Sequence, residues 1–298
     1  MTYSIVARDP ATGDLGVAVQ SHWFAAGIVC WARPGVGAVA TQATALIDHG
    51  PLALDLLAAG AGAEGSLRAR LEADADREVR QVAVLDRAGD VAAHTGASCI
   101  PEAGHRTGDG FSCQANMMRR ATVWDAMAEV FAAARGDLAS RLLVALEAGE
   151  AEGGDIRGRQ AARLLVVRAE ATERPWEDVL VDLRVDDHPE PLRELRRLFD
   201  LKRAYDRLEA AEEMELAGDP EGALRERRAA IEGMPDNPEA AFWTAVSLGL
   251  RGRVEEARPL VAFAVGADAG WSDLLRRLAD RGLMQVTPEL GEALLRRD

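Results

Sequence analysis

The segment TYSIVARDPATGDLGVAVQSH, residues 2–22, decides the fold of the first part of the chain. Residues 3–9 and 15–20 are β-forming runs, and the residues from Pro10 to Asp14 supply turn chemistry between them. This pattern predicts a β-hairpin that starts at the second residue of the chain. The same reasoning predicts strands at 37–42, 79–86, 91–95, 160–168 and 179–185, and helices at 51–59, 67–73, 123–134 and 138–148.

The order of these elements indicates the fold class. Hairpins alternate with pairs of helices, and parallel crossovers are few. We therefore expect an α+β domain with mostly antiparallel sheets and helix pairs on their faces, and not a doubly wound fold.

The remainder of the chain has a different character. Residues 188–191, His-Pro-Glu-Pro, break regular structure and predict a linker between a first domain at 1–187 and a second at 192–298. In the second domain, pairs of similar residues recur 34 positions apart: Gly218 and Gly252, Ala223 and Ala257, Ala211 and Ala245, Ile231 and Val265. A helix-turn-helix period of this length resembles a tetratricopeptide repeat, and an unrelated helical bundle is the alternative.

The number of repeats predicts self-association. About two repeats are visible, fewer than the ~3 that usually stand alone, so apolar end faces need a cover. Phe242, Trp243, Phe263 and Trp271 lie in this region. If one stays exposed it marks an interface, which predicts a homo-oligomer. The alternative is burial of all four against residues 1–185.

Composition excludes several partners. The formal net charge of -14 repels nucleic acid and anionic membranes. No run approaches the ~18 apolar residues of a membrane span, and Arg8 and Asp9 interrupt any secretory signal. Three cysteines without metal-ligand spacing fit a reducing cytoplasm, and no cofactor motif is present. Lys202 is the single lysine, so no lysine of the first domain can act as a base.

Thr2 is the first candidate for chemistry. Removal of Met1 would leave Thr2 at the amino terminus, where its hydroxyl can attack while its α-amino group, with a pKa near ~8, accepts the proton. A strand that begins at Thr2 would hold this nucleophile rigidly. The alternative is that the chain begins Met-Thr for no catalytic reason, as many proteins do.

Three further segments accompany Thr2. Hairpin pairing brings Ser21 and His22 back towards Thr2, and His22 could tune the amine or bind substrate. Residues 35–42, GVGAVATQ, could offer backbone N–H groups to an oxyanion or form a core strand. In residues 153–160, GGDIRGRQ, Asp155 and Arg157 could clamp each other or a substrate carboxylate.

Residues 94–118 are dense in His, Cys, Asn and Gly. They allow a thiol nucleophile, with Cys99 or Cys113 paired to His94 or His105. A metal site from His94, His105 and Asp109 would have loose ligand spacing. A purely structural loop is the remaining alternative.

Six segments taken together resemble a known family. They are TYSIVARD (2–9), LGVAVQS (15–21), GVGAVATQ (35–42), AAHTG (92–96), GDGF (108–111) and GGDIRGRQ (153–160). Residues 2–185 thereby resemble the bacterial domain-of-unknown-function family numbered ten twenty-eight. The resemblance implies an αββα sandwich of the N-terminal-nucleophile (Ntn) hydrolase type and no settled activity. In similar proteins a helical or peptidoglycan-binding segment often follows this domain.

The start of the chain is also similar to a proteasome-type β subunit. Thr2 lies where its terminal threonine would, Gln20-Ser21 where an Asp-Ser pair would, and residues 155–158 where an Asp-x-x-Ser-Gly motif would. The sequence departs from that pattern at three positions. Gln20 replaces an acid, Gly158 replaces a serine, and His22 stands where similar sequences often carry lysine.

The sequence therefore predicts a cytoplasmic amide hydrolase that acts on a small or peptide-like amide without metal or cofactor. The expected catalytic set is Thr2, His22, Gln42 and Asp155, and the expected substrate-binding set is Ser21, Thr41, His94, Asn116 and Arg157. The competing hypothesis is a catalytically silent domain that serves as a binding or assembly module through its helical tail.

Overall fold

The structure, a computed structural model, describes residues 2–296 and begins with the expected hairpin. Strands β1 (Thr2–Arg8) and β2 (Leu15–Ser21) pair antiparallel, with Thr2 opposite Ser21. In the turn, Asp9 Oδ1 accepts hydrogen bonds from the backbone amides of Ala11 and Thr12. This closure explains why a Pro-Ala-Thr-Gly-Asp segment connects the two strands.

Two antiparallel sheets follow from this start. The first has six strands in the order β10-β9-β2-β1-β8-β7, with β7 (Gly104–Gly108), β8 (Phe111–Asn116), β9 (Ala161–Val167) and β10 (Val179–Val185). The second has four strands in the order β3-β4-β5-β6, with β3 (Cys30–Arg33), β4 (Gly37–Ala43), β5 (Arg80–Asp86) and β6 (Val91–Thr95). Short 3-10 helices lie at Ala26–Val29, Arg77–Val79 and Pro175–Glu177.

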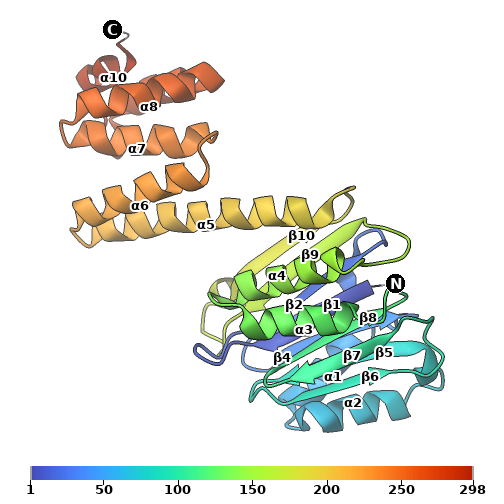
Figure 1. Cartoon of the computed structure of the whole chain (residues 1–298). Helices are drawn as coiled ribbons and strands as arrows, with labels where there is room; N and C mark the ends of the chain where they lie inside the picture. Colours follow the sequence, from blue (N-terminus) through green and yellow to red (C-terminus); the bar gives the residue numbers. More distant parts are fainter. Residues whose placement is uncertain (1, 297–298) are drawn as a thin grey trace. The chain divides into compact units, whose positions relative to one another are not determined.

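Helices cover the outer face of each sheet (Figure 1). Helices α1 (His49–Ala58) and α2 (Gly62–Glu72) pack on the four-stranded sheet. Helices α3 (Val123–Ala133) and α4 (Leu138–Ala151) pack on the six-stranded sheet. Since β1 and β2 also contact β4, the domain has four layers in the order helices, sheet, sheet, helices. The α+β class with antiparallel sheets is confirmed.

An apolar core fills part of the space between the sheets. Val6, Val17 and Val19 of the six-stranded sheet pack against Ala40 and Leu85 of the other. Strands β4 and β5 approach each other closely at Gly37, where an added Cβ would lie 2.3 Å from the Leu85 carbonyl oxygen. The small residues of segment 35–42 therefore serve strand packing at that end of β4.

Strand β3 and the β7–β8 hairpin were not predicted. Strand β7, GHRTG, is an edge strand without apolar alternation, and most of it is exposed. Strand β8, FSCQAN, is buried on both faces although half of its residues are polar. Much of residues 94–118 is therefore strand and not loop. The sequence did not predict these strands, because burial here does not follow hydrophobicity.

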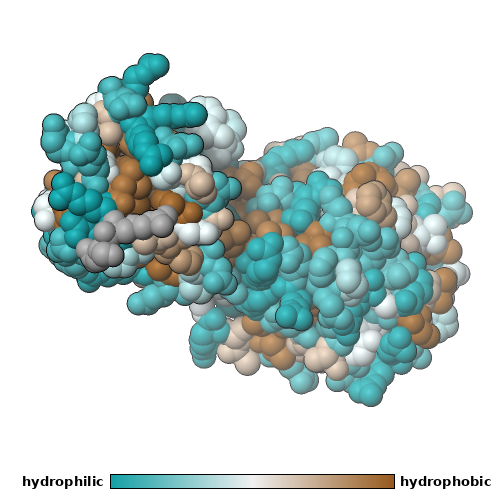
Figure 2. Space-filling model, turned by 90° about the horizontal axis from the view of Figure 1, so that it is seen from above, coloured by the Kyte–Doolittle hydropathy of each residue, from teal (hydrophilic) through white to brown (hydrophobic). Residues whose placement is uncertain are grey.

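Most of the surface seen in Figure 2 is hydrophilic, and apolar residues reach it as separate patches. Charged residues make up 28% of the chain, with a formal net charge of -14. Among residues 2–296, no helix is both long and apolar enough to cross a membrane.

The chain divides into two compact units at Arg197 and Leu198. Regular structure stops at residues 186–190, near the predicted linker, but α5 (Pro191–Leu216) runs across the division. The second unit continues with α6 (Pro220–Gly233), α7 (Pro238–Leu250), α8 (Val254–Ala267), α9 (Gly270–Arg281), a 3-10 turn (Leu283–Gln285) and α10 (Pro288–Leu295). A helical C-terminal region is confirmed.

The 34-residue spacing corresponds to equivalent positions in this region. Helices α6 and α8 start 34 residues apart, and each has 14 residues. Gly218 and Gly252, before these helices, have φ angles of 82° and 74°. The alanines at 211, 223, 245 and 257 are fully buried, so the repeated small residues lie where helices meet.

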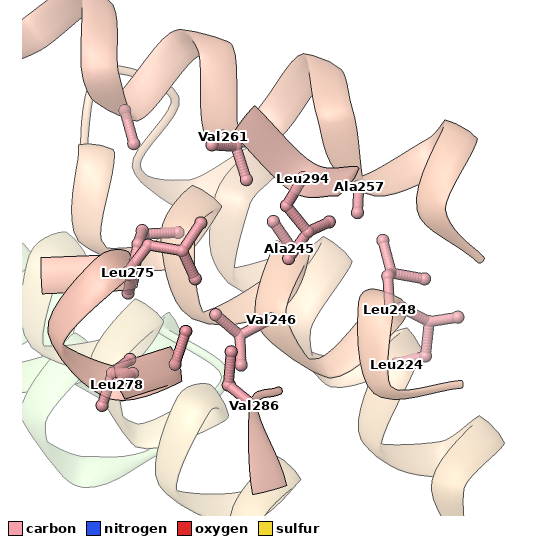
Figure 3. Close-up of a cluster of buried hydrophobic side chains, with 13 residues drawn as sticks. Leu224, Ala245, Val246, Leu248, Ala257, Val261, Leu275, Leu278, Val286 and Leu294 are labelled. Atoms are coloured by element: carbon pink, nitrogen blue, oxygen red, sulfur yellow. The ribbon is translucent and has the colours of Figure 1, made fainter. Parts of the chain in front are cut away.

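The tail has its own apolar core (Figure 3). Phe242 is fully buried there, and Trp243 and Trp271 contact its ring at centroid distances of 4.9 and 5.0 Å. Phe263 is 42% exposed, so the alternative in which all four aromatic residues are buried is wrong.

Candidate functional site

Strand β1 is a central strand of the six-stranded sheet (Figure 1), and Thr2 is its first residue. Ser21 of β2 and Asn116 of β8 are its neighbours across the sheet. The Thr2 hydroxyl donates a hydrogen bond of 3.0 Å to Ser21 Oγ, and Thr2 is only 4% exposed. The hairpin therefore places Ser21 beside Thr2, as strand pairing predicts.

A glycine-rich loop is anchored at the same end of the sheet. Asp155 forms an isolated bridge with Met118, shortly after β8, and its carboxylate is fully buried. Asp155 Oδ2 accepts a hydrogen bond of 3.1 Å from the backbone N–H of His22, the residue after Ser21. Asp155 also accepts from the Arg157 backbone amide at 2.9 Å and from its guanidinium Nη2 at 3.1 Å. Asp155 and Arg157 thus lie at the Thr2 end of the sheet.

His22 contributes its backbone here more than its ring. The imidazole Nδ1 lies 3.1 Å from the carbonyl oxygen of Arg159, which makes Nδ1 the protonated nitrogen. This contact helps to hold residues 153–160 in place. Among residues 2–296 no hydrogen bond joins the imidazole to Thr2, and the tuning of the Thr2 amine by the His22 ring stays a prediction.

Buried amide side chains hold the Thr2 backbone by hydrogen bonds to its carbonyl oxygen. Gln42 Nε2 and Asn116 Nδ2 donate to the Thr2 carbonyl oxygen at 3.2 and 3.3 Å. The same two nitrogens donate to Gln81 Oε1, at 2.7 and 3.0 Å. Gln81 in turn donates to the hydroxyl of Thr95 and to the carbonyl oxygen of Ala115. Gln42 therefore holds the Thr2 carbonyl, and its side-chain N–H donors are all engaged.

The hydrogen bonds continue along the space between the sheets. Ser4 Oγ donates to Gln42 Oε1, Gln114 Nε2 donates to Ser4 Oγ, and Ser112 Oγ donates to Gln114 Oε1. We call Ser4, Gln42, Gln81, Ser112, Gln114 and Asn116 the amide network; all six are at most 1% exposed. An unpaired polar group buried this deeply costs about 1–3 kcal/mol, and a fully paired network is rigid.

Sequence reasoning missed Ser4, Gln81 and Gln114 as parts of this site. One signal was available: Ser4 and Gln114 occupy inward-facing positions in strands that are otherwise buried. A polar side chain at such a position needs a partner in the opposite sheet, so it marks a place where polar groups meet.

Two expected site residues lie elsewhere. Thr41 faces α1 and α2, away from the six-stranded sheet, and its hydroxyl donates to the carbonyl oxygen of Leu46 at 3.3 Å. His94 is opposite Val82, which packs in the core under α1 and α2, and its Nε2 lies 2.9 Å from the Arg77 carbonyl oxygen. Since neighbouring residues of a strand point to opposite faces, Thr95 and not His94 reaches the amide network.

The thiols are poor nucleophiles in this structure. Burial raises the pKa of Cys30 to about 12 and that of Cys113 still higher. Burial also raises the pKa of Cys99, whose Sγ lies 3.3 Å from the Arg80 carbonyl oxygen. Each thiol is therefore protonated near neutral pH, which disfavours the thiol mechanism.

The metal alternative has no support in the geometry either. Within residues 2–296, no three His, Cys, Asp or Glu side chains gather as metal ligands. The ring of His94 faces the Arg77 carbonyl oxygen, and Nδ1 of His105 lies 2.8 Å from the Thr95 hydroxyl.

Backbone strain gathers at the Thr2 end. Ala25, Ala43, Glu102 and Met117 adopt left-handed φ angles between 45° and 69°. Ala43 follows Gln42, Met117 follows Asn116, and the Glu102 carbonyl accepts from the Met118 amide. Such conformations cost about 1–2 kcal/mol per residue and cluster at functional sites.

Comparisons with known proteins agree with the family resemblance of the six sequence segments. The model of a family described as a family of unknown function, DUF1028, matches residues 2–195. The chain belongs to this family. A DUF1028 protein from Silicibacter pomeroyi with a known crystal structure is 32% identical, with a TM-score of 0.60 over 66% of this chain and 87% of that one. No curated protein matches the sequence. The DUF1028 match covers the four-layer domain and the start of α5, so the rest of the tail lies outside it.

Proposed function

We propose that this protein is an N-terminal-nucleophile amide hydrolase with Thr2 as its nucleophile, and that its four-layer domain is of the Ntn hydrolase type. One observation carries the proposal: Thr2 begins a central strand with its hydroxyl on Ser21 and its carbonyl held by Gln42 and Asn116. A rigid threonine at the start of a chain is what this chemistry requires. The substrate would be a small or peptide-like amide in the cytoplasm.

The proposed reaction starts from a chain without Met1, a residue outside those that the structure describes. The Thr2 α-amino group accepts the hydroxyl proton, and Oγ1 attacks the amide carbonyl carbon. The carbon–nitrogen bond breaks, the proton moves to the leaving amine, and an ester on Thr2 remains. Water then attacks the ester, the α-amino group accepts its proton, and release of the acid restores the Thr2 hydroxyl.

Each neighbour has a separate part in this reaction. Ser21 Oγ accepts the hydroxyl hydrogen in the resting enzyme and orients Oγ1. Gln42 and Asn116 are positioning residues, because they contact the Thr2 backbone and not its hydroxyl. Asp155, paired with Arg157, fixes the loop that borders Thr2 and the backbone of His22.

Substitution of Thr2 tests the proposal. Thr2→Ala should abolish amide hydrolysis, a loss of at least ~10³-fold in kcat, and Thr2→Ser should retain part of it. Thr107→Ala on exposed strand β7 is the matched control and should leave the rate unchanged. Mass spectrometry of the amino terminus must accompany each assay. An active Thr2→Ala variant, or an active protein that retains Met1, would refute the assignment.

We also propose that the tail is tetratricopeptide-like and associates with a second copy. The equivalent helices α6 and α8 and the exposed ring of Phe263 support this role. A catalytically silent domain that only assembles through its tail is the second candidate function. Retention of Met1 in native protein, together with an oligomer that depends on the tail, would favour that candidate.

A further inference from the structure

Two loops border the Thr2 end of the sheet. One follows β2 at residues 22–25, and the other is the glycine-rich loop at 153–158. The bond from the His22 amide to the buried Asp155 carboxylate joins them. Within one or two residues of this bond, Trp23, Phe24 and Ile156 expose 44%, 64% and 52% of their surface.

The size of this apolar rim, defined as Trp23, Phe24 and Ile156, indicates what covers it. Large apolar side chains have roughly 150–250 Å² each, so these exposed fractions leave on the order of 300 Å² uncovered. A stable protein partner buries about 800 Å² on each side, much more than the rim offers. A small apolar group of a ligand fits this area. Trp23 and Phe24 closely follow Ser21, which contacts the Thr2 hydroxyl, so the substrate is the ligand that we infer.

A cation lies beside the same rim. The backbone N–H of Arg119 donates to Gly154 O, and its guanidinium Nη2 donates to Ile156 O at 3.3 Å. The nearby arginines 120, 157 and 159 each pair with a carboxylate. Arg119 pairs with no carboxylate of residues 2–296. An arginine side chain has five N–H donors in a fork that matches a carboxylate. The Arg119 guanidinium uses one of them on the Ile156 carbonyl oxygen, so others can bind a ligand carboxylate.

We propose that the Thr2 site takes amides that carry both an apolar group and a carboxylate. The apolar group packs on the rim, and the carboxylate binds the Arg119 guanidinium. This inference rests on the proposed hydrolase function, because only that function makes the bound amide a substrate. The recognition itself is a binding property that can be measured without turnover.

Four probes separate the two recognition elements. They are N-phenylacetylglycine, N-acetylglycine and the carboxamide of each, so that ring and charge vary independently. Calorimetry on the Thr2→Ala protein measures their affinities, because this variant keeps the rim and lacks the nucleophile. We expect N-phenylacetylglycine to bind at least ~10-fold more tightly than each of the other three.

Variants assign the contacts. Arg119→Gln should weaken the two acids by about 10- to 100-fold and leave the carboxamides within about 3-fold. Arg120→Gln is the matched control, since Arg120 is paired with Glu152. Phe24→Ser should weaken the phenylacetyl compounds about 5- to 10-fold and leave the acetyl compounds unchanged.

The outcomes divide clearly. The inference is supported if N-phenylacetylglycine binds most tightly and if this preference is lost in Arg119→Gln and kept in Arg120→Gln. Equal affinities for acid and carboxamide, or no binding at about 10 mM, overturn it. A solution mass that falls with Phe24→Ser overturns it too, because a second copy would then cover the rim. If the ranking holds but protein with a confirmed Thr2 terminus hydrolyses none of the probes, the hydrolase proposal fails and the ligand class stands.

Discussion

Replacement of Gln81 by leucine tests whether the amide network holds the domain together. Gln81 accepts from Gln42 and Asn116 and donates to the Thr95 hydroxyl and to the carbonyl oxygens of Gly104 and Ala115. Leucine has a similar volume and can make none of these five bonds. Gln42 and Asn116 keep their bonds to Thr2, which limits the damage.

The expected loss follows from the bonds that disappear. At about 1 kcal/mol for each bond, with some relief from Thr2, the free energy of unfolding should fall by about 3–5 kcal/mol. For a domain of this size, 1 kcal/mol corresponds to about 2–4 °C in Tm, so Tm should fall by roughly 6–20 °C.

Urea unfolding and calorimetry of the full chain measure this loss. Gln160→Leu is the control, because Gln160 is only partly buried and donates one bond to Asp187. It should cost less than about 1 kcal/mol. A Gln81→Leu protein within about 1 kcal/mol of wild type would show that the network is not rigid and does not position Thr2.

Three further predictions concern other parts of the chain. Both amide atoms of the fully buried Gln20 lack a partner among residues 2–296, so Gln20→Met should raise the free energy of unfolding by about 1–3 kcal/mol; a decrease would reveal an interaction of the amide that methionine cannot replace. Burial lowers the pKa of His49 below its ordinary value near ~6.5, so the neutral ring stabilises the fold above that pH and this stability is lost as pH falls through the folded pKa. Urea titrations at pH 7, 6 and 5 should therefore show a steeper decline in wild type than in His49→Gln, and parallel curves would contradict this. Deletion of residues 195–298, and separately Phe263→Ser, should lower the number of chains per particle measured by light scattering; an unchanged number of chains after both changes would refute self-association through the tail.

Local patterns in the sequence determined much of the architecture. The β1–β2 hairpin, the two helix pairs and the helical tail each arise from residues close together in the chain. Alternation, turn residues and a 34-residue period carry that information, because they reflect geometry over a few residues or one repeat. Family membership could likewise be inferred from six short motifs.

Stacking of the two sheets decided the rest. Thr2, Gln42, Gln81 and Asn116 belong to four different strands and meet only when the sheets pack face to face. The sequence pointed to His94 where the structure uses Thr95, although the two are adjacent. Alternation predicts that neighbours face opposite ways, but only the packing of one sheet on the other decides which of them faces inward.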